Sequence, residues 1–252
     1  MRRASLTAIA LTLATAGALA HVAPSVDDNN RYLKITPLGD RFRIAYTVFF
    51  GEVPGATERM SIDANRDGAI SEAEGHAFGL ALAAKVAAAL DVELDGQVRP
   101  IRWSSVDVGM GTPQVAAGSF SVDLVAYACF ARPRGRHRIV VRDRFAIARP
   151  GESEARVEDS PGISIEHARV GQLEDPAHDY RFAGPDGPLA DDGFDVAIDA
   201  GDRAVVVPDA DCPAVPTARG VPKMLVALLL VGAAALAAAS WFFVRRRRNR
   251  AS

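Results

Sequence analysis

The residues best suited to chemistry form one twelve-residue segment, 63–74, which reads Asp-Ala-Asn-Arg-Asp-Gly-Ala-Ile-Ser-Glu-Ala-Glu. Oxygen-bearing side chains stand at positions 1, 3, 5, 9 and 12, and a glycine stands at position 6. This is the spacing of an EF-hand calcium loop, in which position 7 adds a backbone carbonyl and position 12 a bidentate carboxylate. The segment therefore predicts a calcium site with these ligands: Asp63, Asn65, Asp67, Ala69, Ser71 and Glu74.

A second interpretation of the same segment needs no metal. Ser71 and Glu74 have the spacing of a capping box, so a solvated acidic turn could simply lead into a helix. The agreement at six positions, with Ile70 as the apolar residue at position 8, favours calcium. The sequence contains no second loop of this spacing. We therefore expect a structural site rather than a sensor, with a dissociation constant of about 10⁻⁴ to 10⁻³ M.

Histidine nitrogen offers a different donor chemistry, and His21 is the candidate residue. If a signal peptide is cleaved after Ala20, the α-amine and imidazole of His21 form a chelating pair for nickel, cobalt or copper. A terminal histidine that binds no metal is the alternative. The other four histidines lack metal-binding spacing and are predicted to be structural, although His167 could meet another histidine in space: His76, His137, His167 and His178.

Catalytic and phosphate-binding motifs are missing from the sequence. It has no nucleophile elbow, phosphate loop, dinucleotide fingerprint or Cys-x-x-Cys pair, so we predict that the protein is not an enzyme. A hydrolase with a dispersed site is the least favoured class.

The formal net charge of −2 hides an asymmetry, because 21 of the 29 Lys and Arg and all 31 acidic residues lie within 21–221. That acidic region excludes nucleic acid as a partner and favours cations.

The elements that would position the loop are mostly strands. Residues 41–50 alternate apolar and polar side chains, and 32–36 precede them across a turn at 37–40, which predicts a hairpin. The fold class is therefore mainly β, an antiparallel, immunoglobulin-like sandwich. The Ala-rich segment 71–90 and a short segment at 55–61 predict helices on either side of the loop, so the EF-hand-like unit is an insertion. Further strands are expected at 92–94 and 98–101 around Asp95-Gly96, and at 119–130, 137–147, 163–170, 194–198 and 204–207.

Both ends of the chain resemble targeting signals. Residues 1–20 have the basic start, short apolar run and Ala-x-Ala site of a secretory signal peptide, whereas an uncleaved anchor would need a longer run. Residues 224–244 are uncharged and apolar and precede an arginine cluster. They predict one transmembrane helix with a cytoplasmic tail at 245–252. The domain 21–207 is then extracytoplasmic, on a Pro-rich stalk at 208–223, in a single-pass cell-membrane protein. A sorting tag removed after export is the alternative.

The two cysteines of the chain, Cys129 and Cys212, both fall in the exported part. An oxidising compartment permits a disulfide between them, which would tie the stalk to the domain. Alternatively, Cys212 belongs to a sorting or lipidation signal. The sequence leaves both possibilities open.

This order of features resembles the extracytoplasmic N-terminal region of bacterial hydrogenase/urease-accessory nickel–cobalt permeases. The resemblance covers about residues 20–100 and rests on the Ala-His start, the strands up to Phe50, Glu52-Val53-Pro54, the loop and Val92–Gly96. It implies an accessory role in nickel or cobalt uptake beside a metal permease. The chain departs from the pattern because Val22 follows His21 where proline is expected, and one anchor replaces the multi-helix permease. The alternative is a surface-displayed structural or interaction protein.

Overall fold

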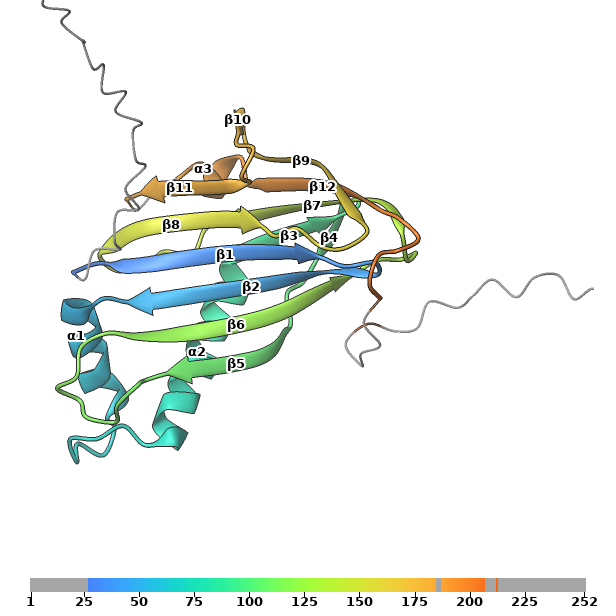
Figure 1. Ribbon diagram of the computed structural model, residues 1–252. Helices are drawn as coiled ribbons and strands as arrows, with labels where there is room; N and C mark the ends of the chain where they lie inside the picture. The colour runs from blue at the N-terminus through green and yellow to red at the C-terminus, as the bar shows by residue number, and fades with distance from the viewer. Residues whose placement is uncertain (1–26, 185–186, 207–211, 213–252) are drawn as a thin grey trace, which may run out of the picture.

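Two six-stranded β sheets face each other in a computed structural model that describes residues 27–184, 187–206 and 212 (Figure 1). The mainly β, sandwich-type fold predicted from the sequence is confirmed. The elements in chain order are β1 (Asn29–Pro37), β2 (Arg41–Phe50), α1 (Glu52–Ile62), α2 (Glu72–Ala89), β3 (Leu90–Leu94), β4 (Gln97–Arg99), β5 (Trp103–Gly109), β6 (Phe120–Cys129), β7 (Gly135–Asp143), β8 (Pro150–Val157), β9 (Ile163–Val170), β10 (Leu173–Glu174), β11 (Asp179–Ala183), α3 (Pro188–Asp191) and β12 (Phe194–Ala200).

The strand order is β11-β8-β1-β2-β6-β5 in the first sheet and β10-β9-β12-β7-β3-β4 in the second. The two predicted hairpins, β1–β2 and β3–β4, are present. All neighbouring strands are antiparallel except β1 and β8, which run parallel. The expectation of a purely antiparallel sandwich is therefore wrong at this pair. Such a pair needs a long crossover connection, which here includes all the elements from β2 to β7.

The hydrophobic core lies between the two sheets and follows from the alternation of side chains along each strand. Because successive side chains point to opposite faces, every second residue of β2 faces the core, as the sequence predicted. The second sheet supplies the opposite layer, including Ile139, Val141, Val196 and Ile198. The buried residues of β2 are Phe42, Ile44, Tyr46, Val48 and Phe50.

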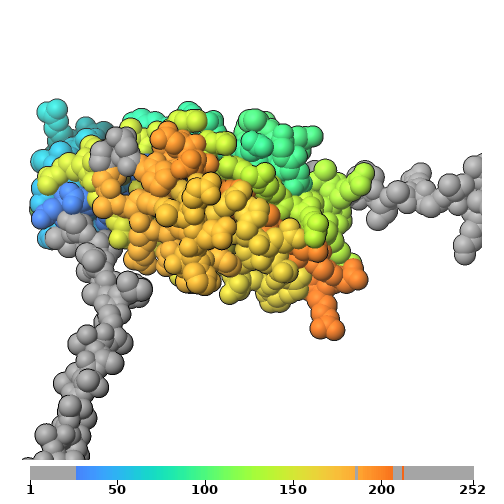
Figure 2. Space-filling view, turned by 90° about the horizontal axis from the view of Figure 1, so that it is seen from above, coloured from blue at the N-terminus to red at the C-terminus, as the bar shows by residue number. Residues whose placement is uncertain are grey.

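Helices α1 and α2 lie on one side of the sandwich (Figure 1). Helix α2 packs on edge strand β5, where Gly79 leaves no room for a Cβ beside Val106 and Val108. The indole nitrogen of Trp103 on β5 donates a hydrogen bond of 2.8 Å to the carbonyl of Ala83. The chain then passes directly from α2 into β3 of the second sheet, so α2 links the two sheets (Figure 1). Strands β8 to β12 form most of the face seen from above in Figure 2.

A buried polar cluster also connects the two sheets. Asp143 at the end of β7 accepts a hydrogen bond of 2.8 Å from the hydroxyl of Tyr46 on β2. The guanidinium of Arg31 on β1 lies 3.4 Å from the same carboxylate. Burial, followed by the charge of Asp143, raises the pKa of Tyr46 well above its usual value, so this phenol stays protonated. All three residues are buried between the sheets.

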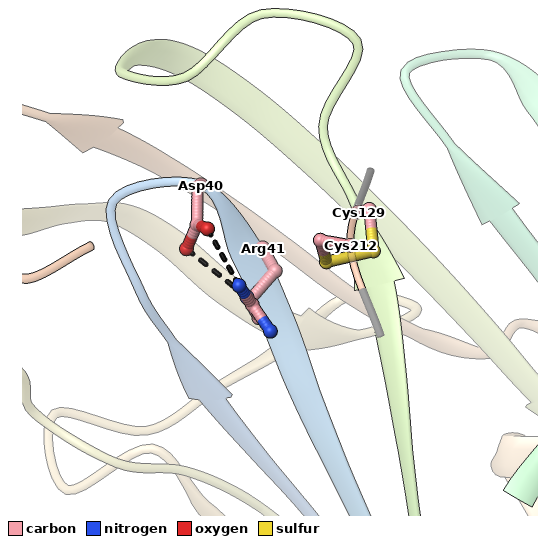
Figure 3. Close-up of a disulfide and its surroundings, with 4 residues drawn as sticks. All are labelled: Asp40, Arg41, Cys129 and Cys212. Atoms are coloured by element: carbon pink, nitrogen blue, oxygen red, sulfur yellow. Dashed lines mark hydrogen bonds and ion pairs between the residues drawn. A yellow bond between two sulfur atoms is a disulfide. The ribbon is translucent and has the colours of Figure 1, made fainter. Parts of the chain in front are cut away.

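The structure pairs Cys129 with Cys212 in a disulfide, with a Cα–Cα distance of 5.5 Å, and this decides between the two alternatives of the sequence (Figure 3). Cys129 ends β6 and lies opposite Arg41 of β2 in the sheet register. The buried Arg41 forms a bidentate pair with Asp40 in the turn between β1 and β2. Cys212, which lies within the predicted stalk, is thus tied to this end of the sandwich.

Several predicted boundaries are corrected. The strand expected at 137–147 ends at Asp143, because its carboxylate accepts the N–H of Phe145 in a turn. Residues 204–206 form no strand, while Val207 lies outside the described residues. Strands β5, β8, β10 and β11 and the short helix α3 were not predicted, since they are short or rich in polar residues.

No helix in the described part of the chain is long and apolar enough to span a bilayer. The predicted signal peptide, the candidate ligand His21, the transmembrane helix and the cytoplasmic tail all lie outside the described residues. So does the predicted stalk, except for Cys212.

Candidate metal site

The segment 63–74 lies between two helices, as the sequence predicted. Helix α1 ends at Ile62, and Asp63 is its C-cap. Ser71 is the N-cap of α2, and it forms a capping box with Glu74. Helix α1 begins at Glu52, three residues earlier than expected, and its first turn is buried at Pro54 and Gly55, where Gly55 lies against Gly118. The result is a helix–loop–helix unit in which five candidate ligand positions lie between the helices and the sixth, Glu74, lies in the first turn of α2.

The side-chain oxygens of the first three candidate ligands accept hydrogen bonds from backbone N–H groups of the loop. The two oxygens of Asp63 accept from Asp67 at 3.1 Å and from Gly68 at 3.0 Å. Asn65 Oδ1 also accepts from the N–H of Asp67, at 2.9 Å. Asp67 Oδ1 in turn accepts from the N–H of Ala69 at 2.9 Å. These bonds fold the loop around its acidic side chains.

Glu74 returns from the start of α2 to the beginning of the loop. Its Oε1 accepts from the N–H of Ala64 at 3.0 Å and from that of Asn65 at 3.4 Å. Its Oε2 accepts from the N–H and the hydroxyl of Ser71 at 2.9 and 2.7 Å. Hydrogen bonds from Ser71 first, and then from Asn65 and Ala64, lower the pKa of Glu74. The carboxylate at position 12 is thus anionic at neutral pH and joins both ends of the loop.

The turn of the loop depends on backbone conformations that most residues avoid. Gly68, at position 6, has φ of 84°, and Arg66, at position 4, has φ of 60°. Glycine adopts this left-handed region without the steric cost that a Cβ brings. Gly68 therefore has the role that the EF-hand pattern gives to its glycine.

A second segment, 110–119 between β5 and β6, supports the loop from outside. The N–H of Ile70 donates to the carbonyl of Pro113 at 2.7 Å, and the N–H of Val115 donates to the carbonyl of Gly68 at 3.1 Å. Ala69 and Gln114 form an isolated antiparallel bridge between these bonds. The side chain of Ile70 is buried in the core, as expected for position 8. Sequence reasoning missed this support, because 110–119 has no regular periodicity.

Arg59 is a further residue beside the loop that the sequence analysis did not single out. It lies in the last turn of α1 and is fully buried, although it belongs to one of the most polar residue types. Its guanidinium donates to carbonyl groups of the segment 110–119 and lies 5.4 Å from the ring centroid of Phe120. A charged residue in an amphipathic helix gives no local sign of burial. The carbonyl acceptors belong to Met110, Thr112, Gln114, Gly118 and Ser119.

The donor chemistry of the loop suits calcium. Its candidate ligands offer only oxygen atoms, which hard cations prefer, whereas nickel, cobalt and copper favour nitrogen donors. Within the described residues, no three or more His, Cys, Asp or Glu side chains are grouped so that they could hold a metal ion. The loop oxygens are instead hydrogen-bonded to backbone amides. A hollow of about 620 Å³, lined by Ser71, Glu72 and His76 and by Met110–Pro113, adjoins the loop.

Two of the other histidines have defined structural partners. The buried ring of His137 is stacked on Phe130, and its Nδ1 lies 2.9 Å from a carboxylate oxygen of Asp95. His167 lies 3.2 Å from Asp195, so its neighbour is an aspartate and not another histidine. Burial acts to raise the pKa of Asp195, but hydrogen bonds from Arg138 and His167 outweigh it and lower that pKa. These contacts agree with the predicted structural roles.

Comparison with known proteins adds no assignment. No protein-family model matches the chain, and no curated protein sequence matches it either. The class of protein is therefore defined by its architecture, a mainly β sandwich that carries a helix–loop–helix unit on one side. The resemblance to nickel–cobalt permeases stays a prediction.

Proposed function

We propose that this chain is a membrane-anchored extracytoplasmic binding or accessory protein, not an enzyme, whose loop 63–74 binds one calcium ion. The observation that carries the proposal is the loop itself. Its oxygen donors occur in EF-hand order between two helices, and hydrogen bonds to Glu74 join its beginning and its end. The residues that would hold calcium are Asp63, Asn65, Asp67, Ala69, Ser71 and Glu74.

The position of the loop supports a structural role for the ion. The loop joins α1 to α2, and α2 in turn covers β5 and continues into β3. A divalent cation bound in the loop would neutralise the carboxylates of Asp63, Asp67 and Glu74 and would hold the two helices together. Calcium would therefore stabilise the side of the sandwich that the helices close.

The wider biological role extends beyond the described residues. We propose an accessory function in nickel or cobalt uptake beside a metal permease, supported by the sequence resemblance and by the chelating potential of His21. The immunoglobulin-like character of the sandwich and the single membrane span at 224–244 belong to the same proposal. Surface display with a removable C-terminal tag is the alternative. The disulfide of Cys212 is compatible with both the uptake role and surface display.

The calcium proposal is tested by thermal unfolding of the full-length chain with and without 10 mM Ca²⁺. For a dissociation constant of about 10⁻⁴ M, calcium should stabilise the wild type by about 2.7 kcal/mol. Glu74→Gln should abolish most of this gain. Glu72→Gln is the matched control, because it makes the same charge change at position 10, which supplies no ligand. If Glu74→Gln and wild type melt alike in calcium, the loop is not a calcium site.

The role of His21 has a separate test. The processed chain is titrated with Ni²⁺, Co²⁺ and Cu²⁺, and the titration is repeated with one extra residue placed before His21. We expect binding tighter than about 10 μM that the extra residue weakens, because it removes the free α-amine from the chelate. Equal affinity for both forms would eliminate the chelate, while the calcium proposal would stand.

A further inference from the structure

The guanidinium of Arg59 is surrounded by the segment 110–119. It lies 2.8 Å from the carbonyl oxygen of Thr112 and 3.1 Å from those of Gln114 and Gly118. No carboxylate in the described part of the chain forms an ion pair with it. A buried charge is costly unless its hydrogen bonds are satisfied. The segment 110–119 must therefore keep its curved path around Arg59 to supply these acceptors.

The same segment is hydrogen-bonded to two successive peptide groups of the loop. The peptide between Gly68 and Ala69 directs its carbonyl to the N–H of Val115, and the next peptide directs the N–H of Ile70 to Pro113. A trans peptide is planar, with its N–H and C=O pointing in opposite directions. The N–H of Ala69 and the carbonyl of Ala69 must then both point away from the segment 110–119.

The side to which they point is the side of the Asp67 carboxylate. The N–H of Ala69 reaches Asp67 Oδ1 at 2.9 Å, which places that carboxylate on the far side of the loop strand from Pro113. The carbonyl of Ala69 faces the same side, because the adjoining N–H of Ile70 is held by Pro113. Position 7 of the loop is the position whose backbone carbonyl binds calcium.

We propose that Arg59 is a positioning residue for the calcium site, acting through the segment 110–119 to hold the carbonyl of Ala69 toward the ion. This inference rests on the proposed function of the loop. Groups that orient metal ligands without touching the metal typically contribute 10- to 100-fold to metal affinity. In this chain, one buried side chain of the entering helix determines the orientation of a backbone ligand ten residues later.

The experiment compares Arg59→Lys with Arg41→Lys in the full-length chain. Lysine keeps the charge, but its three N–H donors cannot replace the five of the guanidinium, which reaches five carbonyls. Arg41 is an equally buried arginine at the disulfide end of the sandwich, so its variant controls for general destabilisation (Figure 3). Calcium affinity is measured by titration. The number of water molecules on bound Tb³⁺, used as a calcium probe, is measured from luminescence lifetimes in H₂O and D₂O.

Arg59→Lys should weaken calcium binding at least about 10-fold and add about one water to bound Tb³⁺, because the Ala69 carbonyl leaves the ion. Arg41→Lys should lower the melting temperature with wild-type affinity and water count. If the two variants give the same affinity and hydration, Arg59 has only a structural role and the inference is wrong.

Amide hydrogen exchange on the wild type keeps the inference testable if Arg59→Lys does not fold. The N–H groups of Ile70 and Val115 should be protected without calcium, because the segment already holds the loop. Unprotected exchange at both positions in calcium-free protein would overturn the inference but leave the calcium proposal intact. A wild-type chain that binds neither Ca²⁺ nor Tb³⁺ would overturn both.

Discussion

Replacement of Asp143 by alanine should destabilise the sandwich more than any change to a surface charge. The carboxylate, only 2% exposed, faces Arg31 at 3.4 Å and accepts from the Tyr46 hydroxyl at 2.8 Å and from the Phe145 N–H at 2.9 Å. Alanine would leave a buried guanidinium without its counter-charge and a buried phenol without its acceptor. Removal of one partner of such a pair typically costs about 3 to 5 kcal/mol.

For a domain of this size, each kcal/mol lowers the melting temperature by about 2 to 4 °C. Asp143→Ala should therefore lower it by about 10 °C, measured by circular dichroism and checked by urea titration. Glu158→Ala is the control, because it breaks only the half-exposed pair with Lys34 and one hydrogen bond from Thr36, and it should cost about 1 kcal/mol.

A double replacement separates the buried charge from the packing. Arg31→Met combined with Asp143→Leu removes both charges and should recover much of the loss, since an apolar pair of similar volume avoids the desolvation cost. The reasoning fails if Asp143→Ala costs no more than Glu158→Ala. It also fails if the double variant is less stable than Asp143→Ala alone.

Four further changes have defined outcomes. In urea titrations, Gly79→Ala should lower the free energy of unfolding by about 1 to 2 kcal/mol, because its methyl would lie 2.5 Å from a Val108 methyl. Gly75→Ala has no contact closer than 3.9 Å, so it should raise the free energy of unfolding by up to about 1 kcal/mol through helix propensity. Burial, followed by the charge of Asp179, raises the pKa of Glu154, so its ionised form opposes folding at neutral pH. Glu154→Gln should therefore stabilise the fold by up to about 1 kcal/mol at pH 7. This gain should disappear as the pH falls through the raised pKa to below 4.5. Melting curves at several pH values measure it. Serine at both cysteines should cost up to about 4.5 kcal/mol, because the disulfide spans 83 residues, and the reduced wild type should melt like the variant.

Much of the fold near the loop was predictable, because its determinants are local. The hairpin of β1 and β2, the hairpin of β3 and β4, and helix α2 follow from side-chain periodicity and turn residues that lie within about twenty positions of one another. Strands β5, β8 and β11 were missed for the opposite reason. The β8 sequence is polar on its outer face, and its place in the sheet depends on a parallel pairing with β1, more than a hundred residues away.

The loop 63–74 likewise has features that the sequence predicts and features that depend on distant residues. The order of oxygen donors, the glycine at position 6 and the capping box of Ser71 with Glu74 are consecutive features, so the sequence by itself determined the candidate ligands and the turn that presents them. The support of the loop depended on the tertiary structure. Arg59 and Gln114 are 55 residues apart, and the irregular chain between β5 and β6 shows no periodicity that would link them.

Only the tertiary structure decided the pairing of Cys129 with Cys212 and the burial of Arg31, Asp143 and Tyr46 between the sheets. Each of these depends on which distant strands become neighbours. A sequence pattern shows only which face of a single helix or strand is apolar. A local motif can name the atoms that would bind an ion. The contacts that hold those atoms in place come from parts of the chain that meet only after folding.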